Sequence, residues 1–403
     1  MGQQQTKMDA GGWMLVLTVA LGYCVDAYDL LVFSAVRNSS LASIGVAKEA
    51  MAGVGISLMN WQLTGLVLGG FLWGILADKL GRKSTLFYSI GLYSLANIAN
   101  ALVTDVNTYT LLRFLAGIGL AGELGVGVSL ITEAVPSNKR TLATHSVGIL
   151  GVLGAVLGGV AAFSLPWKAC YIIGGAAGLL LLTLRVKLHE SDQFNQLKAT
   201  NAERGSLITY IREPRLLLTL LSCTIAGSAT FVCVLLFIQG APDLGKIWHL
   251  QPEGSVAVIA FYLGTVPAIV LAGTMSKKMK SRKKPMLFSY LLLALAILYF
   301  IYTPTDTNQA FYVKCFLLGA GTGYWPLLIT ASAELFPTHI RATSATSVPN
   351  IARAWSIPFT IIFKSIHTPD NFIFVVLTLA LVAVGISLTA SLFLRETFEN
   401  AAE

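Results

Sequence analysis

The chain alternates between long apolar blocks and short polar segments along its whole length. The apolar blocks that are long enough to span a membrane are 12–36, 54–78, 84–103, 109–134, 141–163, 168–186, 214–238, 253–275, 285–303, 309–333, 343–365 and 372–394. A helix needs about 20 mostly apolar residues to cross the hydrocarbon layer of a bilayer. The pattern therefore predicts an all-α polytopic membrane protein with twelve transmembrane helices.

The composition agrees with this prediction and excludes several other classes. The chain is 55% hydrophobic and 12% charged, whereas soluble domains carry about 25% charged residues. The five cysteines lie in or beside apolar blocks without CxxC spacing, so neither a metal site nor redox chemistry is expected. No nucleophile elbow, phosphate loop or metal-ligand motif is present. We therefore expect a protein that is not an enzyme and needs no cofactor.

The basic residues indicate how the chain is oriented. The net charge is +8, but Lys and Arg occur in short runs between apolar blocks, which favours membrane topology over nucleic-acid binding. Runs after every second block contain Lys79, Arg82 and Lys83, then Lys139 and Arg140, and later Lys277 to Lys284. Since basic loops stay in the cytoplasm, both termini are predicted to be cytoplasmic, in a bacterial inner membrane.

The chain also divides into two similar halves. The segment 187–213 is the longest polar stretch, and it separates residues 1–186 from residues 214–403. The pattern E-x-x-P-x-x-x-R runs from Glu133 to Arg140 and recurs from Glu334 to Arg341, at an offset of 201 residues. This repeat predicts two pseudo-symmetric six-helix bundles joined by a linker that forms a surface helix.

A ten-residue loop between the second and third blocks indicates the family. Residues 74–83 read GILADKLGRK, which resembles the major facilitator superfamily's G-x-L-A-D-[RK]-x-G-R-[RK] loop. The resemblance implies a gating role for this loop and for the repeated motif, at Gly74, Asp78, Gly81, Arg82, Lys83, Glu133, Arg140, Glu334 and Arg341. The alternative is a short loop whose basic residues only fix the topology.

Physical chemistry gives the gating residues specific tasks. Gly74 lets two helices approach closely, and Asp78 suits the N-terminus of a neighbouring helix, where the dipole favours an anion. Arg82 and Lys83 are expected to hold carboxylates across the boundary between the halves. The second copy of the loop has Lys277 in place of the aspartate, so its latch is expected to be weaker or different.

Two shorter runs resemble proton-coupled carriers. Residues 22–30 contain a D-x-x-D element, Asp26 and Asp29, that is similar to that of aromatic-acid:proton symporters. Residues 113–123 are similar to the R-F-x-x-G-x-G-x-[AG]-G-E run of metabolite:proton symporters. Sugar-transporting relatives share part of the second run, so the substrate class stays open.

Few ionisable groups fall at membrane depth, where they are costly and usually carry function. Asp26, Asp29 and Glu123 are the candidate proton-coupling residues, and Asp29 is expected to pair with Arg113 at a similar depth. Alternatively, the carboxylates make interhelical hydrogen bonds and never titrate. Lys314, on the tenth block, is expected to lie on a span that lines the central cavity.

The candidate substrate-binding residues are Arg113, Asn350, Arg353, Tyr324 and Trp325. An arginine can bind an anion through its forked donors, although Arg353 is equally suited to pair with a carboxylate that holds the halves together. The two aromatic residues suit either a pocket or packing.

The sequence thus predicts a monomeric secondary transporter for proton-coupled uptake of a small organic anion, a carboxylate-type metabolite, by alternating access. An efflux antiporter for a drug, siderophore or other metabolite is the first alternative. A receptor that resembles a transporter is the second. No motif for the direct use of ATP is present.

Overall fold

The first half of the chain forms seven long helical segments. The computed structural model describes residues 8, 10–186, 190–199, 204–368 and 370–398. The helices of the first half are α1 (Ala10–Ser43), α2 (Lys48–Leu80), α3 (Arg82–Asn100), α4 (Val106–Leu120), α5 (Gly122–Ala134), α6 (Ser137–Ser164) and α7 (Trp167–Arg185). The helices α4 and α5 together form one predicted span, interrupted at Ala121.

The second half repeats this arrangement after two short linker helices, α8 (Asp192–Ala199) and α9 (Ile208–Arg212). Its elements are α10 (Pro214–Cys233), the π-helix η1 (Val234–Gln239), α11 (Ala241–Ile247), α12 (Gly254–Met279), α13 (Lys283–Tyr302), α14 (Asn308–Ala320), α15 (Trp325–Glu334), α16 (Arg341–Ala354), α17 (Ser356–Ile366) and α18 (Phe372–Phe393). The pairs α14–α15 and α16–α17 each form one span, as α4–α5 does.

Each of the twelve predicted spans is therefore helical, and the all-α fold is confirmed. Nine of the described helical stretches are long and apolar enough to cross a membrane by length and composition alone. The spans that do not meet both the length and the hydropathy requirement are α3 and the two interrupted pairs of the second half. The helix α3 is long enough but carries many polar residues, which are considered below.

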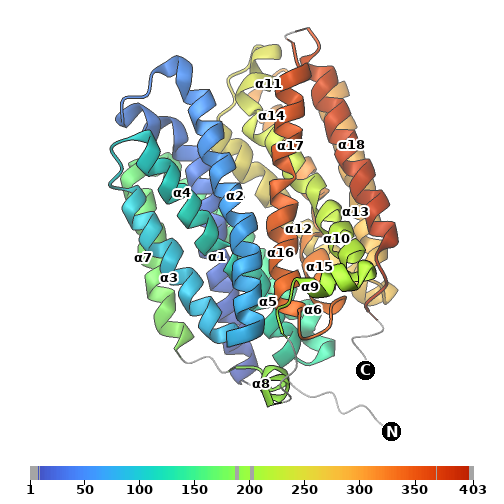
Figure 1. The fold of residues 1–403 in the computed structure, drawn as a ribbon. Helices are drawn as coiled ribbons and strands as arrows, with labels where there is room; N and C mark the ends of the chain where they lie inside the picture. Colours follow the sequence, from blue (N-terminus) through green and yellow to red (C-terminus); the bar gives the residue numbers. More distant parts are fainter. Residues whose placement is uncertain (1–7, 9, 187–189, 200–203, 369, 399–403) are drawn as a thin grey trace.

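The helices run side by side, with α1 to α7 on one side of the molecule and α10 to α18 on the other (Figure 1). The two sides meet where α2 packs against α16 and α6 packs against α12. The start of α1 and the end of α18 lie at the same end of the molecule, which is the lower end in Figure 1. We refer to this as the lower end and to the opposite one as the upper end.

The helices of the two halves approach most closely near the lower end. A Cβ atom added at Gly74 of α2 would lie 2.5 Å from the Cα of Thr343 on α16. A Cβ atom added at Gly125 on α5 would lie even closer, 2.2 Å, to the Cα of Thr346 on α16. The close approach predicted for Gly74 is confirmed, and it brings the polar loops of the two halves within hydrogen-bonding distance.

Candidate functional site

At the lower end, Asp78 of α2 binds the first turn of α16. Its carboxylate accepts hydrogen bonds from the backbone N–H groups of Ala342 (3.2 Å) and Thr343 (2.9 Å), and from the Thr343 hydroxyl (2.7 Å). The first N–H groups of a helix have no partner within the helix, so a buried carboxylate there stabilises it. The position predicted for Asp78 is confirmed.

Arg82 connects this carboxylate to the repeated motif. Its guanidinium lies 3.2 Å from Asp78 and 2.8 Å from Glu133, and it donates a hydrogen bond to the carbonyl of Thr338 in the other half (3.3 Å). Arg341 approaches Glu133 from the second half at 3.7 Å. We call Asp78, Arg82, Glu133 and Arg341 the first latch, because they join the two halves at the lower end.

The prediction that Arg82 and Lys83 hold carboxylates across the boundary is wrong for both residues. Arg82 pairs with Asp78 and Glu133 of its own half and crosses the boundary only to a carbonyl. The Lys83 ammonium donates to the carbonyl of Val186 in its own half (2.9 Å) and holds no carboxylate across the boundary among the described residues. The carboxylate near it is Glu190, which accepts from the backbone N–H groups of Arg82 (3.0 Å) and Lys83 (3.1 Å). Gly81 is needed just before these N–H groups, since its φ of 113° is unfavourable for other residues.

The second half contains an ion pair at the matching place. Arg282 binds Glu334 through two hydrogen bonds of 2.6 Å, and the backbone N–H of Arg282 donates to Glu396 (2.9 Å). Arg140 makes no ion pair within the described part of the chain, and its Nε donates to the Val135 carbonyl (3.2 Å). Arg282 also donates to the Thr141 hydroxyl of the first half (3.3 Å), and we call Arg282, Glu334 and Thr141 the second latch. The second latch differs from the first, as expected, although its arginine–glutamate pair is intact.

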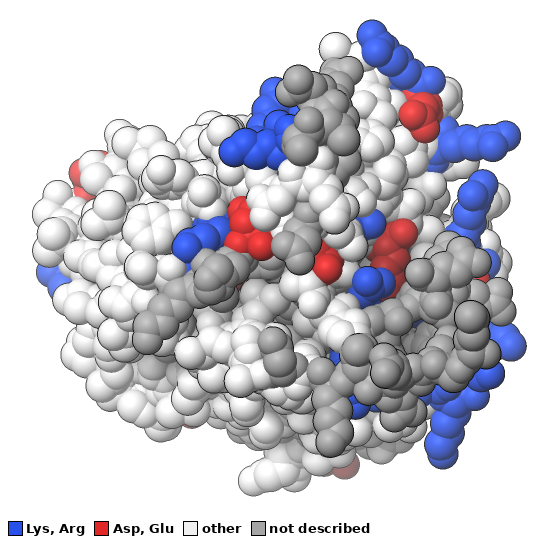
Figure 2. Space-filling view, turned by 90° about the horizontal axis from the view of Figure 1, so that it is seen from below, with Lys and Arg blue, Asp and Glu red and all other residues white. Residues whose placement is uncertain are grey.

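The structure explains why the second half needs no aspartate at the position of Lys277, which matches Asp78 of the first half. The helix α6 faces Lys277 as α16 faces Asp78, but α6 begins at Ser137, about one turn earlier than the matching start of α16 at Arg341. The N–H groups opposite Lys277 therefore lie inside a continuous helix and need no cap. Figure 2 shows the lower end with Lys and Arg side chains gathered at its rim and acidic groups between basic ones.

Between the halves lies a small central cavity of about 60 Å³. Its lining is mostly aromatic and apolar, with one cation, and includes Tyr23, Phe231, Phe261, Tyr262, Trp325 and Arg353. The rings of Phe231 and Trp325 meet edge to face at 5.0 Å, and the Trp325 indole N–H donates to the Tyr23 hydroxyl at 3.3 Å. Such a lining suits a small apolar body that carries one anionic group.

Arg353 is positioned by groups from both halves. Its Nη2 lies 3.8 Å from Asp26 of α1, and its Nη1 donates to the amide oxygen of Asn350 (3.1 Å). The amide nitrogen of Asn350 donates to the carbonyl of Ala121 (2.9 Å), at the break between α4 and α5. Asn350 thus orients Arg353 and is not itself part of the cavity lining.

Asp26 is as poorly satisfied as Asp29, whose two oxygens likewise lack hydrogen-bond partners among the described residues. The Asp26 side chain is fully buried, and neither of its oxygens has a hydrogen-bond partner there. An ionised carboxylate in such surroundings depends on a nearby cation, which here is Arg353 at 3.8 Å. An anion that bound Arg353 would therefore deprive ionised Asp26 of its counter-ion.

The predicted pair of Asp29 and Arg113 is confirmed at 3.7 Å. Arg113 also donates to Asn97 (2.6 Å) and Asn100 (3.3 Å) of α3, and it stacks over Tyr171 at 4.8 Å. Arg113 is fully buried inside the first half and absent from the lining of the central cavity. The structure therefore gives it a place within the first half and not beside the predicted substrate.

Glu123 has a partner that sequence reasoning missed. Arg185, the last residue of α7, binds both of its oxygens, with 2.9 Å between Nη1 and Oε1, and Ser89 donates to it at 3.0 Å. Arg185 stands at the end of an apolar block, where a basic residue is normally attributed to membrane topology. Its side chain is 99% buried, so Arg185 stabilises Glu123 inside the protein and does not face the membrane surface.

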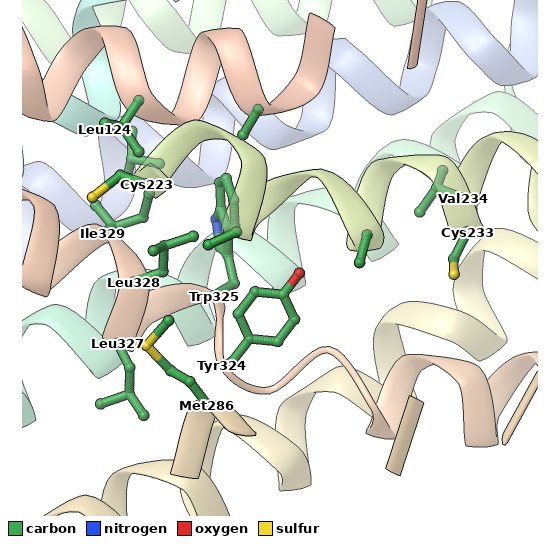
Figure 3. Close-up of a cluster of buried hydrophobic side chains, with 14 of the residues drawn as sticks. Leu124, Cys223, Cys233, Val234, Met286, Tyr324, Trp325, Leu327, Leu328 and Ile329 are labelled. Carbon is green, nitrogen blue, oxygen red and sulfur yellow. The ribbon is translucent and has the colours of Figure 1, made fainter. Parts of the chain in front are cut away.

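The two aromatic candidates have different environments. Figure 3 shows Tyr324 and Trp325 next to each other in a cluster of buried side chains. Trp325 reaches the central cavity, whereas the Tyr324 hydroxyl accepts from Thr230 (2.9 Å) and its ring packs on Tyr290 at 4.5 Å. Tyr324 therefore supports the cavity wall from behind.

Lys314 lies on a span that lines the central cavity through Thr322 and Trp325, as expected, but its own side chain is not part of the lining. Its ammonium donates to the carbonyls of Phe300 (3.1 Å) and Thr303 (2.6 Å) and to the hydroxyl of Thr305 (2.5 Å). These acceptors stand at the end of α13, where a cation is favoured by the helix dipole. Lys314 thus stabilises the upper end of α13.

Two larger cavities open between the halves at the upper end. Their volumes are about 280 Å³ and 420 Å³, and they share Arg37, Met59 and Gln239 in their linings. We call them together the upper vestibule. The lower end, by contrast, is joined by the latches, so the structure is closed at the lower end and open at the upper end.

Comparisons with known proteins agree with this architecture. The chain is 27% identical to a Haemophilus influenzae protein named for metabolite transport, over 96% of this chain and 97% of the relative. It is 25% identical to the niacin transporter NiaP of Acinetobacter baylyi, over 93% and 92% of the two chains. It is 29% identical to the 4-hydroxybenzoate transporter PcaK of Pseudomonas aeruginosa, over 48% of this chain and 43% of that one.

The structure of the proton:xylose symporter XylE has the same fold, with a TM-score of 0.74 and 18% identity over 98% of this chain and 99% of that one. Residues 12–361 match the model of the Major Facilitator Superfamily. The chain, a membrane carrier and not an enzyme, therefore belongs to the Major Facilitator Superfamily.

Proposed function

We propose that this carrier takes up a small organic carboxylate together with a proton. The observation that supports this most directly is the contact of Arg353 with Asp26 beside the aromatic cavity between the halves. A guanidinium offers paired donors that fit a carboxylate, and the aromatic walls suit a ring. The relatives named for niacin and 4-hydroxybenzoate carry aromatic monocarboxylates, which makes these acids the first compounds to test.

The same contact offers a way to couple proton and substrate. In the structure, Asp26 is the counter-ion of Arg353. A substrate carboxylate that binds Arg353 would place a second negative charge in a buried site, at a high cost in free energy. Protonation of Asp26 removes that charge. One anion and one proton then enter together, and the net charge of the site is the same before and after binding.

The closed lower end and the open upper vestibule fit one stage of alternating access. Because basic loops stay in the cytoplasm, the basic runs support a cytoplasmic lower end and an upper vestibule that faces the outside. In this state substrate reaches the cavity from the vestibule, whose lining includes Arg37 and Lys364. Occupation of the cavity and release of the two latches would then open the lower end.

The test is transport by the purified protein in proteoliposomes with an inward proton gradient. We expect uptake of niacin or 4-hydroxybenzoate with alkalinisation of the outside solution. Asp26→Asn is expected to abolish gradient-driven accumulation but to keep exchange, and Arg353→Gln to abolish both. Glu49→Gln, which changes an exposed carboxylate that lines neither the central cavity nor the upper vestibule, is the matched control.

Two results would overturn the proposal. If no acid enters and a proton gradient drives extrusion of a larger compound, the carrier is an efflux antiporter for a drug, siderophore or other metabolite. If the acids bind without crossing the membrane, it is a receptor.

A further inference from the structure

The smaller of the two vestibule cavities is a pocket that both halves of the chain form at the upper end. It has a volume of about 280 Å³, and we call it the outer pocket. Its lining includes Arg37 of α1 and Asn60 of α2 from the first half, and Gln239 of η1 and Lys364 of α17 from the second. Within the described part of the chain, it shares no lining residue with the central cavity. At a rise of about 1.5 Å per residue, Arg37 lies about 9 Å further along α1 than Leu31 of the central cavity. The outer pocket is therefore a separate place.

The polar side chains of the outer pocket are not used by the protein itself. Among the described residues, no side-chain hydrogen bond or ion pair is made by Arg37, Asn60, Gln239 or Lys364. The Nε of Arg37 is in addition buried from solvent. Because a buried donor without a partner is costly, such a group ordinarily binds a water molecule or a ligand. The pocket therefore has polar groups from both halves that are available to a ligand.

Arg37 is held by packing and not by a counter-ion. Its side chain lies against Gly55 of α2, where an added Cβ would come within 2.4 Å of the Arg37 Cδ, so a larger residue would displace the arginine. The carboxylate in the lining is Asp243, which is exposed, pairs with Lys246 at 2.8 Å and makes no ion pair with Arg37. The two cations of the lining, Arg37 and Lys364, are thus not neutralised by it. The outer pocket has a net positive charge, which attracts an anion.

Another part of the lining is aromatic. Phe363 of α17 stacks on His367 at 4.5 Å and meets Phe372 of α18 edge to face at 5.6 Å, and all three residues line the outer pocket. Met59 and Leu63 of α2 add apolar surface. Apolar and aromatic walls with a few polar groups are typical of small-molecule sites. A cation without a partner next to a surface for a ring is the combination that suits an aromatic carboxylate.

The outer pocket also has room that the central cavity lacks in this state. Its volume is about 280 Å³, compared with about 60 Å³ for the central cavity. Pockets for drug-sized ligands usually have volumes of about 300–1,000 Å³, and an aromatic monocarboxylate is smaller than such a ligand. While the upper end is open, the outer pocket thus has space for the acid, whereas the central cavity has to widen first.

We propose that the outer pocket is a second binding site for the aromatic acid, which the acid occupies before it enters the central cavity. That the ligand is the transported acid rests on the proposed function. Arg37 donates to the carboxylate, Lys364 adds positive charge, and the ring lies against Phe363. Because Arg37 and Asn60 belong to one half and Gln239 and Lys364 to the other, the site exists only while the upper end is open.

The experiment measures equilibrium binding of radiolabelled niacin and 4-hydroxybenzoate to the purified protein. Arg353→Gln, which disables the central cavity, should still bind the acid in the outer pocket. Adding Arg37→Gln to it should weaken this binding by about 10- to 100-fold, because hydrogen bonds between charged groups are lost. Adding Lys364→Gln instead should weaken it by about two- to fivefold, as expected for an exposed charge. In proteoliposomes, Arg37→Gln alone should raise the KM for uptake by about tenfold and leave kcat within about twofold, since it removes binding and not a transport step.

Lys48→Gln is the matched control, since it removes an exposed cation at the start of α2 that lines neither vestibule cavity. If wild type takes up the acid but monodisperse Arg353→Gln binds none, or binds it equally well with Arg37→Gln added, the outer site is refuted and the proposed function stands. A lower kcat with unchanged binding in Arg37→Gln would also refute the site, because Arg37 would then serve closure of the upper end. If the outer pocket binds the acid but wild type does not transport it, the site stands and the proposed function fails. If wild type neither binds nor moves an aromatic acid, both proposals fail.

Discussion

Asp78→Asn tests whether the first latch sets the balance between the two access states. In the structure this carboxylate accepts three hydrogen bonds from Ala342 and Thr343 and lies 3.2 Å from Arg82. Asparagine has the same size, but it places an amide donor where Thr343 also donates. The substitution thus removes the charge and an acceptor without creating a cavity.

The size of the effect follows from these contacts. Leaving a buried donor unpaired costs about 1–3 kcal/mol, and losing a negative charge at a buried helix N-terminus costs up to about 2 kcal/mol. Arg82 keeps Glu133 at 2.8 Å, so the larger cost of an isolated buried cation does not arise. We expect the closed lower end to lose about 3 kcal/mol, which shifts the ratio of the two states by about 100-fold.

A cysteine reporter measures this shift. Thr346 is fully buried between the halves, facing Gly125, so Thr346→Cys is protected while the lower end is closed. Its labelling by a maleimide is compared with that of the protein without the reporter, which has five native cysteines. Asp78→Asn should accelerate the labelling by about 100-fold. Lys277→Gln, at the matching position of the second half, should not.

Unchanged labelling in Asp78→Asn would refute the latch, because the contacts would then not favour the closed state. Equal acceleration in Lys277→Gln would also refute it, because the effect would no longer depend on the bonds that Asp78 makes to α16.

Two further predictions concern stability. Lys314→Met should lower the free energy of unfolding by about 1–3 kcal/mol, because acceptors at the end of α13 lose their donor, and it should leave the KM unchanged. A changed KM with unaltered thermal unfolding would contradict this structural role. For Glu396, partial burial opposes ionisation, but hydrogen bonds from Arg282 and Ser281 outweigh it and hold the pKa of the carboxyl below its usual value. The stabilisation is therefore present above the usual pKa and lost as the pH falls through the lowered one. In thermal unfolding, Glu396→Gln should lack this acid-dependent step, and parallel pH curves for the two proteins would contradict the reasoning.

The fold and part of the site could be predicted because they depend on local patterns. Apolar blocks give the spans, and the loop at residues 74–83 gives the family. The place of Asp78 at a helix N-terminus and the pairing of Asp29 with Arg113 followed from helix dipoles and depth alone. Such inferences need only the distance along a helix and its direction.

The missed residues depend on which helices are neighbours. Arg185 and Glu190 stand at or beyond the end of a span, where basic and acidic residues usually face water. Only the packing of both α7 and α5 against α3 shows that Arg185 reaches Glu123. The contacts of Lys314 could not be predicted for a related reason, since its position on α14 does not tell which side of the helix faces α13.

Two contacts join the halves at the lower end, one between α2 and α16 and one between α6 and α12, and we call them the two seams. Their different bonding predicts which seam opens more easily. Between α2 and α16, Asp78 binds two backbone N–H groups of the opposite helix. Between α6 and α12, Lys277 takes its place beside a cavity of about 140 Å³, and the hydrogen bond from Arg282 to Thr141 is 3.3 Å long. Because a seam with fewer bonds opens at a lower free energy, amides of residues 142–149 should exchange hydrogen faster than those of residues 343–350. Asp78→Asn should reduce this difference in exchange rate, because it exposes the amides of residues 343–350. Equal protection in wild type, or an unchanged difference in the variant, would show that Asp78 does not distinguish the seams.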